Sequence, residues 1–174
     1  LGLPCKIFMP SNMSIERKQM MQAYGAELVF SDPDDFQGAI QMRDDFISSN
    51  SRSWSPMQFS NEENVICHRE TTALEIFKDV ELLNDKRLAY FVHGAGTGGT
   101  IEGFRQLVVK MGADVKICMV EPKDSPHGIQ GIADGKEFLA ESSNMDRVIR
   151  VSTDEAIKKA VGFSKKTGLL IGIS

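Results

Sequence analysis

The stretch Arg87-Leu88-Ala89-Tyr90-Phe91-Val92-His93-Gly94-Ala95-Gly96-Thr97-Gly98-Gly99-Thr100 gives the clearest indication of the fold. An apolar run typical of a buried strand leads directly into four glycines and two threonines. A segment with apolar residues at helical spacing follows, up to Gly112. A strand, a glycine turn and a helix start form an anion site, because glycine lets the backbone approach closely and the helix start presents free N–H groups. The sequence therefore predicts a site for a phosphorylated small molecule.

The same alternation of strand-like and helix-like segments extends along the whole chain. Besides the run that opens at Arg87, the predicted strands are residues 5–9, 27–30, 115–120, 147–151 and 169–173, and residues 54–59 are predicted as a short strand or an extended segment. Helices are predicted between them, among them residues 64–80 and 152–166. Residues 123–144 contain many glycines, aspartates and serines and match neither pattern. This order predicts parallel sheets covered by helices on both faces.

Helix ends have recognisable signals in three places. Ser14 is a suitable N-cap for a helix that stops at Gly25. Asp32 is predicted to cap the next helix, with Pro33 at its first helical position. Ser152 and Glu155 have the spacing of a capping box. The polar turn at residues 60–63 is the expected seam between two domains.

Composition excludes several classes of protein. The chain has 174 residues, 41% hydrophobic and 25% charged, which is typical of a globular core with a polar surface. A net charge of −4 argues against nucleic acid or an anionic membrane as the main partner. No apolar run approaches the ~20 residues of a membrane span. The three cysteines, Cys5, Cys67 and Cys118, show no CxxC spacing, which favours reduced thiols in a cytoplasmic protein. The three histidines show no metal-ligand spacing, so no metal site is expected.

The two ends of the sequence suggest an internal fragment. The chain starts without methionine, directly before a strand-like run, and it stops at Ser174, where a strand would leave the sheet. We therefore expect these residues to be an interior piece of a longer chain.

Three interpretations of the glycine turn remain open on the residues alone. Gly94 to Gly99 satisfies G-x-G-x-x-G, and Glu121 follows the next strand about 20 residues later, as in a dinucleotide site of an NAD-dependent dehydrogenase. The flanking threonines, Thr97 and Thr100, favour instead a compact cup for a phosphate monoester, which carries close to two negative charges. The third interpretation is a turn that only packs a helix on a strand.

Several blocks together resemble a known family. Gly96-Thr97-Gly98-Gly99-Thr100 is similar to the phosphate loop of the pyridoxal-phosphate-dependent cysteine synthase (O-acetylserine sulfhydrylase) and cystathionine β-synthase family. Further blocks resemble that family in the same order: MPSNMSIER from Met9, AYGAELV from Ala23, QFSN from Gln58, His68 with Thr71-Thr72, VEP from Val120, IQGI from Ile129 and GIS from Gly172. The resemblance spans nearly the whole chain.

The resemblance implies a fold and a reaction. The fold is the two-domain parallel-sheet α/β architecture of fold-type II pyridoxal-phosphate enzymes, with residues 1–60 in the smaller domain and 61–174 in the larger, cofactor-binding domain. The reaction is β-replacement on an activated serine, such as O-acetylserine plus sulfide to cysteine, or synthesis of a related thioether. The implied partners are an amino-acid substrate and a thiol or sulfide, with a homodimer as the assembly and no nucleic acid or membrane.

Site residues follow from the same resemblance. The phosphate loop assigns the 5′-phosphate of pyridoxal 5′-phosphate to Gly96, Thr97, Gly98, Gly99 and Thr100. Ser174 corresponds to a serine that faces the pyridine nitrogen. Gln58 is a candidate donor to the substrate carboxylate, and Gly131 belongs to the loop that closes over the site. His68 and His93 are interpreted as packed or surface residues rather than catalysts.

The chain also departs from the family pattern. The block that carries the Schiff-base lysine is absent, so this lysine is expected upstream of Leu1, and a catalytically inactive relative remains an alternative. Ala73-Leu74 replaces a turn-forming Gly-Pro and favours helix. The segment around Pro126 is shorter than in the family, and Ala133-Asp134 alters the closing loop.

Overall fold

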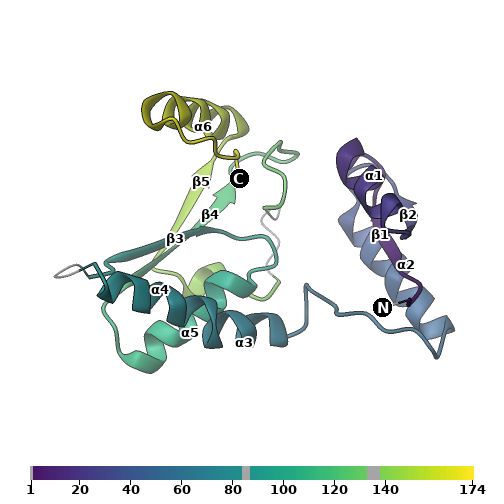
Figure 1. The fold of residues 1–174 in the computed structure, drawn as a ribbon, viewed down its shortest axis with the longest axis horizontal. Helices are drawn as coiled ribbons and strands as arrows, with labels where there is room; N and C mark the ends of the chain where they lie inside the picture. Colours follow the sequence, from purple (N-terminus) through teal and green to yellow (C-terminus); the bar gives the residue numbers. More distant parts are fainter. Residues whose placement is uncertain (1, 84–86, 133–137) are drawn as a thin grey trace. The chain divides into compact units, whose positions relative to one another are not determined.

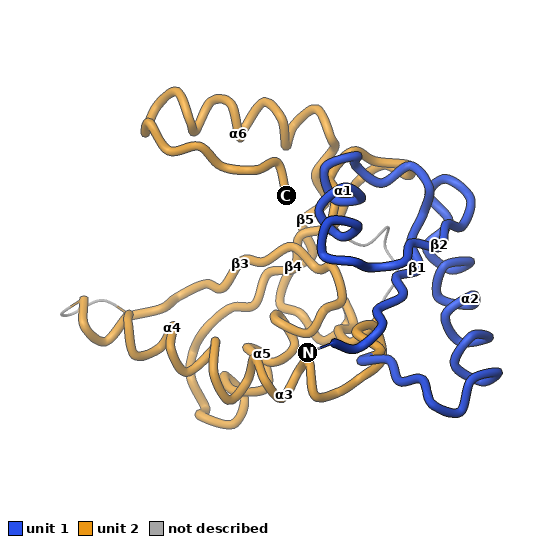
Figure 2. Tube along the Cα trace, turned by 45° about the vertical axis from the view of Figure 1, so that its right-hand side comes forward, with its two compact units in different colours: residues 1–56 blue, residues 57–174 orange. Residues whose placement is uncertain are grey.

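The computed structural model describes residues 2–83, 87–132 and 138–174. These residues form two compact units, Leu1–Pro56 and Met57–Ser174 (Figure 2). Each unit combines parallel strands with helices and is considered by itself.

The first unit is a β-α-β-α arrangement. Its elements are β1 (Lys6–Pro10), α1 (Ile15–Ala23), β2 (Glu27–Ser31) and α2 (Phe36–Ser49). The two strands are parallel, with Lys6 opposite Glu27, and the two side chains form an ion pair at 2.7 Å. Phe8 of β1 and Phe46 of α2 have ring centroids 5.8 Å apart, so α2 packs on this pair of strands.

The helix starts of this unit confirm one sequence prediction and contradict another. Ser14 is the N-cap of α1, and Gly25 has a positive φ of 85° just after its end. The prediction that Asp32 caps α2 with Pro33 at the first helical position is wrong. The N-cap is Asp35, whose carboxylate accepts a hydrogen bond from Gly38 N at 2.8 Å. Ser31 Oγ donates to the Asp35 carbonyl at 2.7 Å and connects this cap to the end of β2, so a local side-chain contact favours the later aspartate.

The second unit contains a three-stranded parallel sheet in the order β3-β4-β5. Its elements are α3 (Glu63–Glu70), α4 (Thr72–Glu81), β3 (Tyr90–Gly94), α5 (Gly99–Met111), β4 (Lys116–Pro122), the 3-10 turn η1 (Ser142–Asn144), β5 (Arg147–Val151) and α6 (Thr153–Thr167). Figure 1 shows α3, α4 and α5 on one side of this sheet and α6 on the other. The predicted capping box is confirmed at the start of α6, where Ser152 and Glu155 bond reciprocally.

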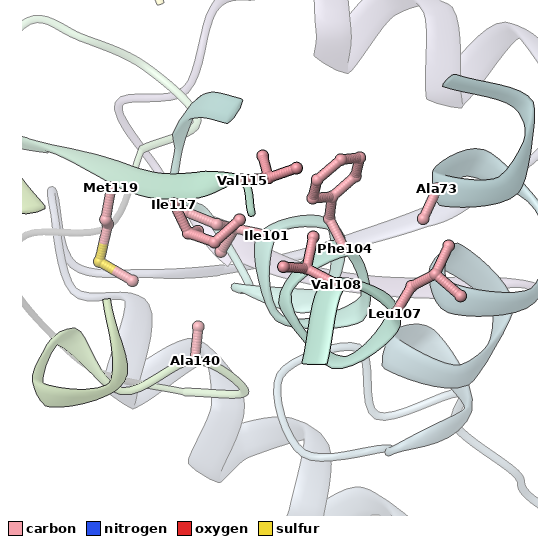
Figure 3. Packing of buried hydrophobic residues seen from close by; sticks show 9 residues of the cluster. All are labelled: Ala73, Ile101, Phe104, Leu107, Val108, Val115, Ile117, Met119 and Ala140. Carbon is pink, nitrogen blue, oxygen red and sulfur yellow. The ribbon is translucent and has the colours of Figure 1, made fainter. Parts of the chain in front are cut away.

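The core of the second unit lies between α5 and the sheet (Figure 3). Phe104, 1% exposed, stacks on Phe91 of β3 at a centroid distance of 3.8 Å and on Phe77 of α4 at 5.4 Å. A Cβ at Gly103 would lie 2.6 Å from the Val65 carbonyl oxygen, so glycine there lets α3 approach α5 closely. This close crossing brings α3 next to the loop that precedes α5.

Other sequence predictions about secondary structure are wrong in detail. The helix predicted over 64–80 is two helices, because Thr71 leaves helical geometry (φ −123°, ψ −80°) and its hydroxyl bonds the Cys67 carbonyl. Of the two alternatives for residues 54–59 the short strand is not formed, and residues 169–173 are not a strand. In the second of these segments Leu170 is 95% exposed and, in the part of the chain that the structure describes, no neighbouring strand pairs with it.

Candidate functional site

The glycine-rich loop joins β3 to α5 as the sequence predicts. β3 ends at Gly94 and α5 begins at Gly99, with Gly98 as N-cap in the left-handed region (φ 85°). The Glu102 amide donates to the Gly98 carbonyl at 3.0 Å and is the first to form an intrahelical bond. The amides before it have no partner within the helix, and the positive end of the helix dipole lies among them.

A cavity of about 440 Å³ opens at this loop. Its wall includes five residues predicted for the cofactor, together with Gln130 and the strand residues Val92 and His93. The five are Gly96, Thr97, Gly98, Thr100 and Ser174, and Gly131, predicted for the closing loop, also lines it. The structure therefore brings together residues that are up to 78 positions apart in the sequence (96 and 174).

Two glycines of the loop make room for neighbouring backbone and side chains. A Cβ at Gly96 would lie 2.5 Å from the Gly131 carbonyl oxygen. A Cβ at Gly98 would lie 2.6 Å from Ala140 N, in addition to the strain of a positive φ. A larger residue at position 96 would push the loop away from Gly131, and one at position 98 would push it away from Ala140. The shape of the cavity therefore depends on these glycines.

The two threonine hydroxyls are held by residues of α3. Thr97 Oγ1 accepts hydrogen bonds from Asn64 Nδ2 at 3.1 Å and from Gly99 N at 3.3 Å. Thr100 Oγ1 lies 3.2 Å from His68 Nε2. Asn64 and His68 are four positions apart and therefore share one face of α3. The sequence indicates a packed or surface residue at His68, and no motif in it points to Asn64.

His93 is the titratable side chain on the cavity wall. Its Nδ1 is buried without a hydrogen-bond partner. Burial lowers the pKa of His93 below its usual 6.5, with the backbone of Gly94 acting in the opposite direction and the charge of His68 adding a smaller lowering. The ring is therefore neutral at pH 7 and packs against Phe91 at a centroid distance of 5.7 Å.

Two predicted site residues do not line the cavity. The Gly99 amide donates a hydrogen bond to Thr97 Oγ1, and Gly99 is not among the residues that line the cavity. Gln58 lies in an exposed turn, and its carbonyl accepts a hydrogen bond from Asn64 Nδ2 at 3.0 Å. The altered residues Ala133 and Asp134 lie outside the described residues.

Glu121 does not take the place that a dinucleotide site requires. Its side chain is buried at the end of β4 and pairs with Arg150 of β5 at 3.4 Å. It is not among the described residues of the cavity wall. The arrangement gives Glu121 a structural role across two neighbouring strands.

The composition of the wall fits a phosphate ester held by neutral donors. The described lining residues include no lysine and no arginine, so hydroxyls and backbone amides face the cavity at the positive end of α5. Among the described residues, no group of three histidine, cysteine or acidic side chains could hold a metal ion. None of the described helices combines the length and apolar character needed to cross a membrane.

Comparisons with known proteins identify the family to which the chain belongs. The family model described as pyridoxal-phosphate dependent enzyme matches residues 1–174. A cysteine synthase from Flavobacterium sp. is 37% identical over 182 residues, covering 98% of this chain and 58% of that protein. Cysteine synthase B of Campylobacter jejuni is 37% identical over 187 residues, covering 100% of this chain and 60% of the relative. The chain thus spans less than two thirds of the length of either relative.

Solved structures show the same similarity in three dimensions. A hydrogen sulfide-producing enzyme from Fusobacterium nucleatum, in complex with an alpha-aminoacrylate intermediate, matches with a TM-score of 0.89 and 33% identity. The match covers 99% of this chain and 55% of that one. The predicted α/β parallel-sheet fold is confirmed by this likeness.

Proposed function

Because the chain belongs to the pyridoxal-phosphate dependent enzyme family, we propose that the protein catalyses β-replacement on an activated serine with pyridoxal 5′-phosphate as cofactor. The proposed reaction joins O-acetylserine and sulfide to give cysteine, or forms a related thioether. The observation that carries the proposal is the cavity at the start of α5, where the hydroxyl-bearing residues Thr97, Thr100 and Ser174 meet.

The phosphate of the cofactor is assigned to the glycine-rich loop. Gly96, Gly98 and Gly99 shape the backbone, and Thr97 and Thr100 supply hydroxyl donors. A bound phosphate ester carries close to two negative charges. The helix dipole and the unpaired amides at the start of α5 stabilise this charge without a cationic side chain.

Ser174 is assigned to the pyridine nitrogen. When bound, the cofactor supplies an electron sink for bond breaking at the substrate Cα. A neutral hydroxyl at the nitrogen leaves that sink milder than an aspartate would, which suits replacement at Cβ. Ser174 therefore orients the ring and limits its electron withdrawal.

Substrate contacts are assigned to Gln58 and Gly131. Gln58 is the proposed donor to the substrate carboxylate, and Gly131, with a φ of 93°, belongs to the segment that covers the cavity. The proton acceptor for the substrate Cα is assigned to the Schiff-base lysine expected upstream of Leu1. No lysine of the described cavity wall competes for this role.

The domain assignment and the assembly belong to the same proposal. Residues 1–60 contribute to the smaller domain and residues 61–174 to the larger, cofactor-binding domain. The protein acts as a homodimer in the cytoplasm on a small amino acid and a thiol or sulfide. Sedimentation of the purified protein and fractionation of its source cells test these two statements.

Spectroscopy of the purified full-length protein, including the region upstream of Leu1, with added pyridoxal 5′-phosphate tests the function. We expect an absorption band at the edge of the visible range that shifts on addition of O-acetylserine, and cysteine formation once sulfide is present. A protein that stays colourless with the cofactor added would overturn the proposal. Bound cofactor without a shift and without cysteine would indicate the catalytically inactive relative instead. The Thr97→Val variant is the control for specific binding at the loop.

A further inference from the structure

The side-chain amide of Asn64 connects two segments that carry proposed ligand contacts. Asn64 lies in the first turn of α3, and its Nδ2 donates to Thr97 Oγ1 at 3.1 Å and to the Gln58 carbonyl at 3.0 Å. A primary amide has two N–H donors. Both are therefore used, one for the glycine-rich loop 33 positions away and one for the turn that precedes α3.

The bond from Asn64 determines what Thr97 can offer the cavity. A threonine hydroxyl has two acceptor lone pairs and one proton. Thr97 Oγ1 accepts from Asn64 Nδ2 and from Gly99 N, so both lone pairs are occupied. The hydroxyl proton of Thr97, which lines the cavity, therefore remains available for a further hydrogen bond. With both lone pairs occupied, the hydroxyl can act only as a hydrogen-bond donor, and an anion requires donors.

Glycine at position 99 leaves room for the same contact between Asn64 and Thr97. A Cβ added at Gly99 would overlap the side-chain amide of Asn64. Gly99 is buried and does not line the cavity. The second glycine of the Gly98-Gly99 pair therefore serves the docking of Asn64, whereas Gly98 serves the turn.

We propose that Asn64 is a positioning residue of the phosphate site: its amide holds the Thr97 hydroxyl with the proton available to the anion and fixes the turn of Gln58 to the same loop. The proposal rests on the proposed function, since it takes the phosphate of pyridoxal 5′-phosphate as the anion. Asn64 itself does not touch the ligand, because its two donors are engaged by protein atoms.

The first test compares ligands with and without the phosphate. The Asn64→Ala variant leaves the Thr97 hydroxyl free to rotate and to donate its hydrogen bond to another acceptor. We expect about tenfold weaker binding of pyridoxal 5′-phosphate and of inorganic phosphate, and unchanged binding of pyridoxal, which lacks the phosphate. Asn144→Ala, which removes an exposed amide bonded to Glu141, is the matched control and should leave all three affinities unchanged.

A double-mutant cycle isolates the route through Thr97. In a Thr97→Val background the hydroxyl is gone, so Asn64→Ala should weaken pyridoxal 5′-phosphate binding by no more than about twofold. Asn64→Asp keeps the side-chain volume but offers only acceptors and adds a negative charge. We expect it to bind inorganic phosphate more weakly than Asn64→Ala. If Asn64→Ala no longer unfolds cooperatively, the Asn64→Asp variant is used for the test in its place.

Each outcome separates the two proposals. Equal loss for pyridoxal and its phosphate, full additivity with Thr97→Val, or no loss at all would overturn the role of Asn64 and leave the proposed function intact. A wild-type protein that binds neither pyridoxal 5′-phosphate nor inorganic phosphate would overturn the proposed function, and the positioning role with it.

Discussion

His68 Nε2 lies 3.2 Å from the hydroxyl of Thr100 in the first turn of α5. The other ring nitrogen lies 2.9 Å from Thr72 Oγ1 in the first turn of α4. One imidazole therefore joins α3, α4 and α5 by side-chain hydrogen bonds. The interpretation of His68 as a packed histidine rather than a catalyst agrees with this geometry, since both ring nitrogens have protein partners.

Replacing His68 by phenylalanine should destabilise the second unit. The ring volume is kept, but two partly buried hydrogen bonds are lost, which corresponds to about 1–2 kcal/mol of the free energy of unfolding. Urea denaturation measures this change. Ser48→Ala, which removes an exposed bond to the carbonyls of residues 44 and 45, is the control and should change the free energy by less than about 0.5 kcal/mol. An unchanged value for His68→Phe would show that these contacts do not hold in solution.

The Gly98→Ala variant should lose stability and cofactor affinity together. Alanine at a φ of 85° is strained, and its Cβ would lie 2.6 Å from Ala140 N. Strain and overpacking together should lower the free energy of unfolding by about 2–4 kcal/mol. The matched control is Gly162→Ala in α6, where the added Cβ lies in open space. This substitution should raise the free energy of unfolding by about 0.5–1 kcal/mol. Similar effects of the two variants in urea titrations would contradict the turn geometry.

Stability should depend on pH through His93. Because burial lowers the pKa of His93 below 6.5, the unfolded chain binds this proton more readily than the folded one. The contribution of the neutral ring is complete above pH 6.5 and is lost as the pH falls from 6.5 through the lower pKa of the folded state. Denaturation at a series of pH values should show a smaller loss for His93→Phe than for the wild type across this window. Parallel curves for the two proteins would argue against a buried, neutral His93.

Truncation of Phe104 should be the most costly core substitution. Its ring is 1% exposed and stacks on Phe91 and Phe77. Phe104→Ala should cost about 3–5 kcal/mol through lost burial and the cavity that remains. Leu82→Ala, at a side chain that is 71% exposed, should cost less than about 0.5 kcal/mol. Thermal or urea unfolding that separates the two variants by less than 1 kcal/mol would contradict the packing in Figure 3.

Several local signals were sufficient to predict structure. The Ser152–Glu155 capping box, the strand that ends at Gly94 and the helix that starts at Gly99 follow from short patterns of neighbouring residues. Other positions depended on local side-chain hydrogen bonds that the pattern does not reveal. Asp35 replaces Asp32 as a cap because Ser31 anchors it, and Thr71 interrupts a segment whose composition favours a continuous helix.

The candidate site likewise contains residues that could be predicted from the sequence and one that could not. Its glycines and threonines could be identified because the loop pattern is contiguous in the sequence. Asn64 could not, because its contact with Thr97 crosses 33 residues and depends on how closely α3 approaches α5 at Gly103. The spacing of Asn64 and His68 on one helix face was the available signal, but it does not say what that face meets.

The sequence by itself determined the alternation of strands and helices and the glycine-rich turn, because periodicity and turn chemistry are properties of short segments. It indicated the family through the resemblance of several blocks in the same order. The tertiary structure alone decided which polar groups meet around the cavity. Hydrogen bonds require donor and acceptor to lie about 3 Å apart, and only the packing of α3, α5 and the segments around Gly131 and Ser174 sets such distances.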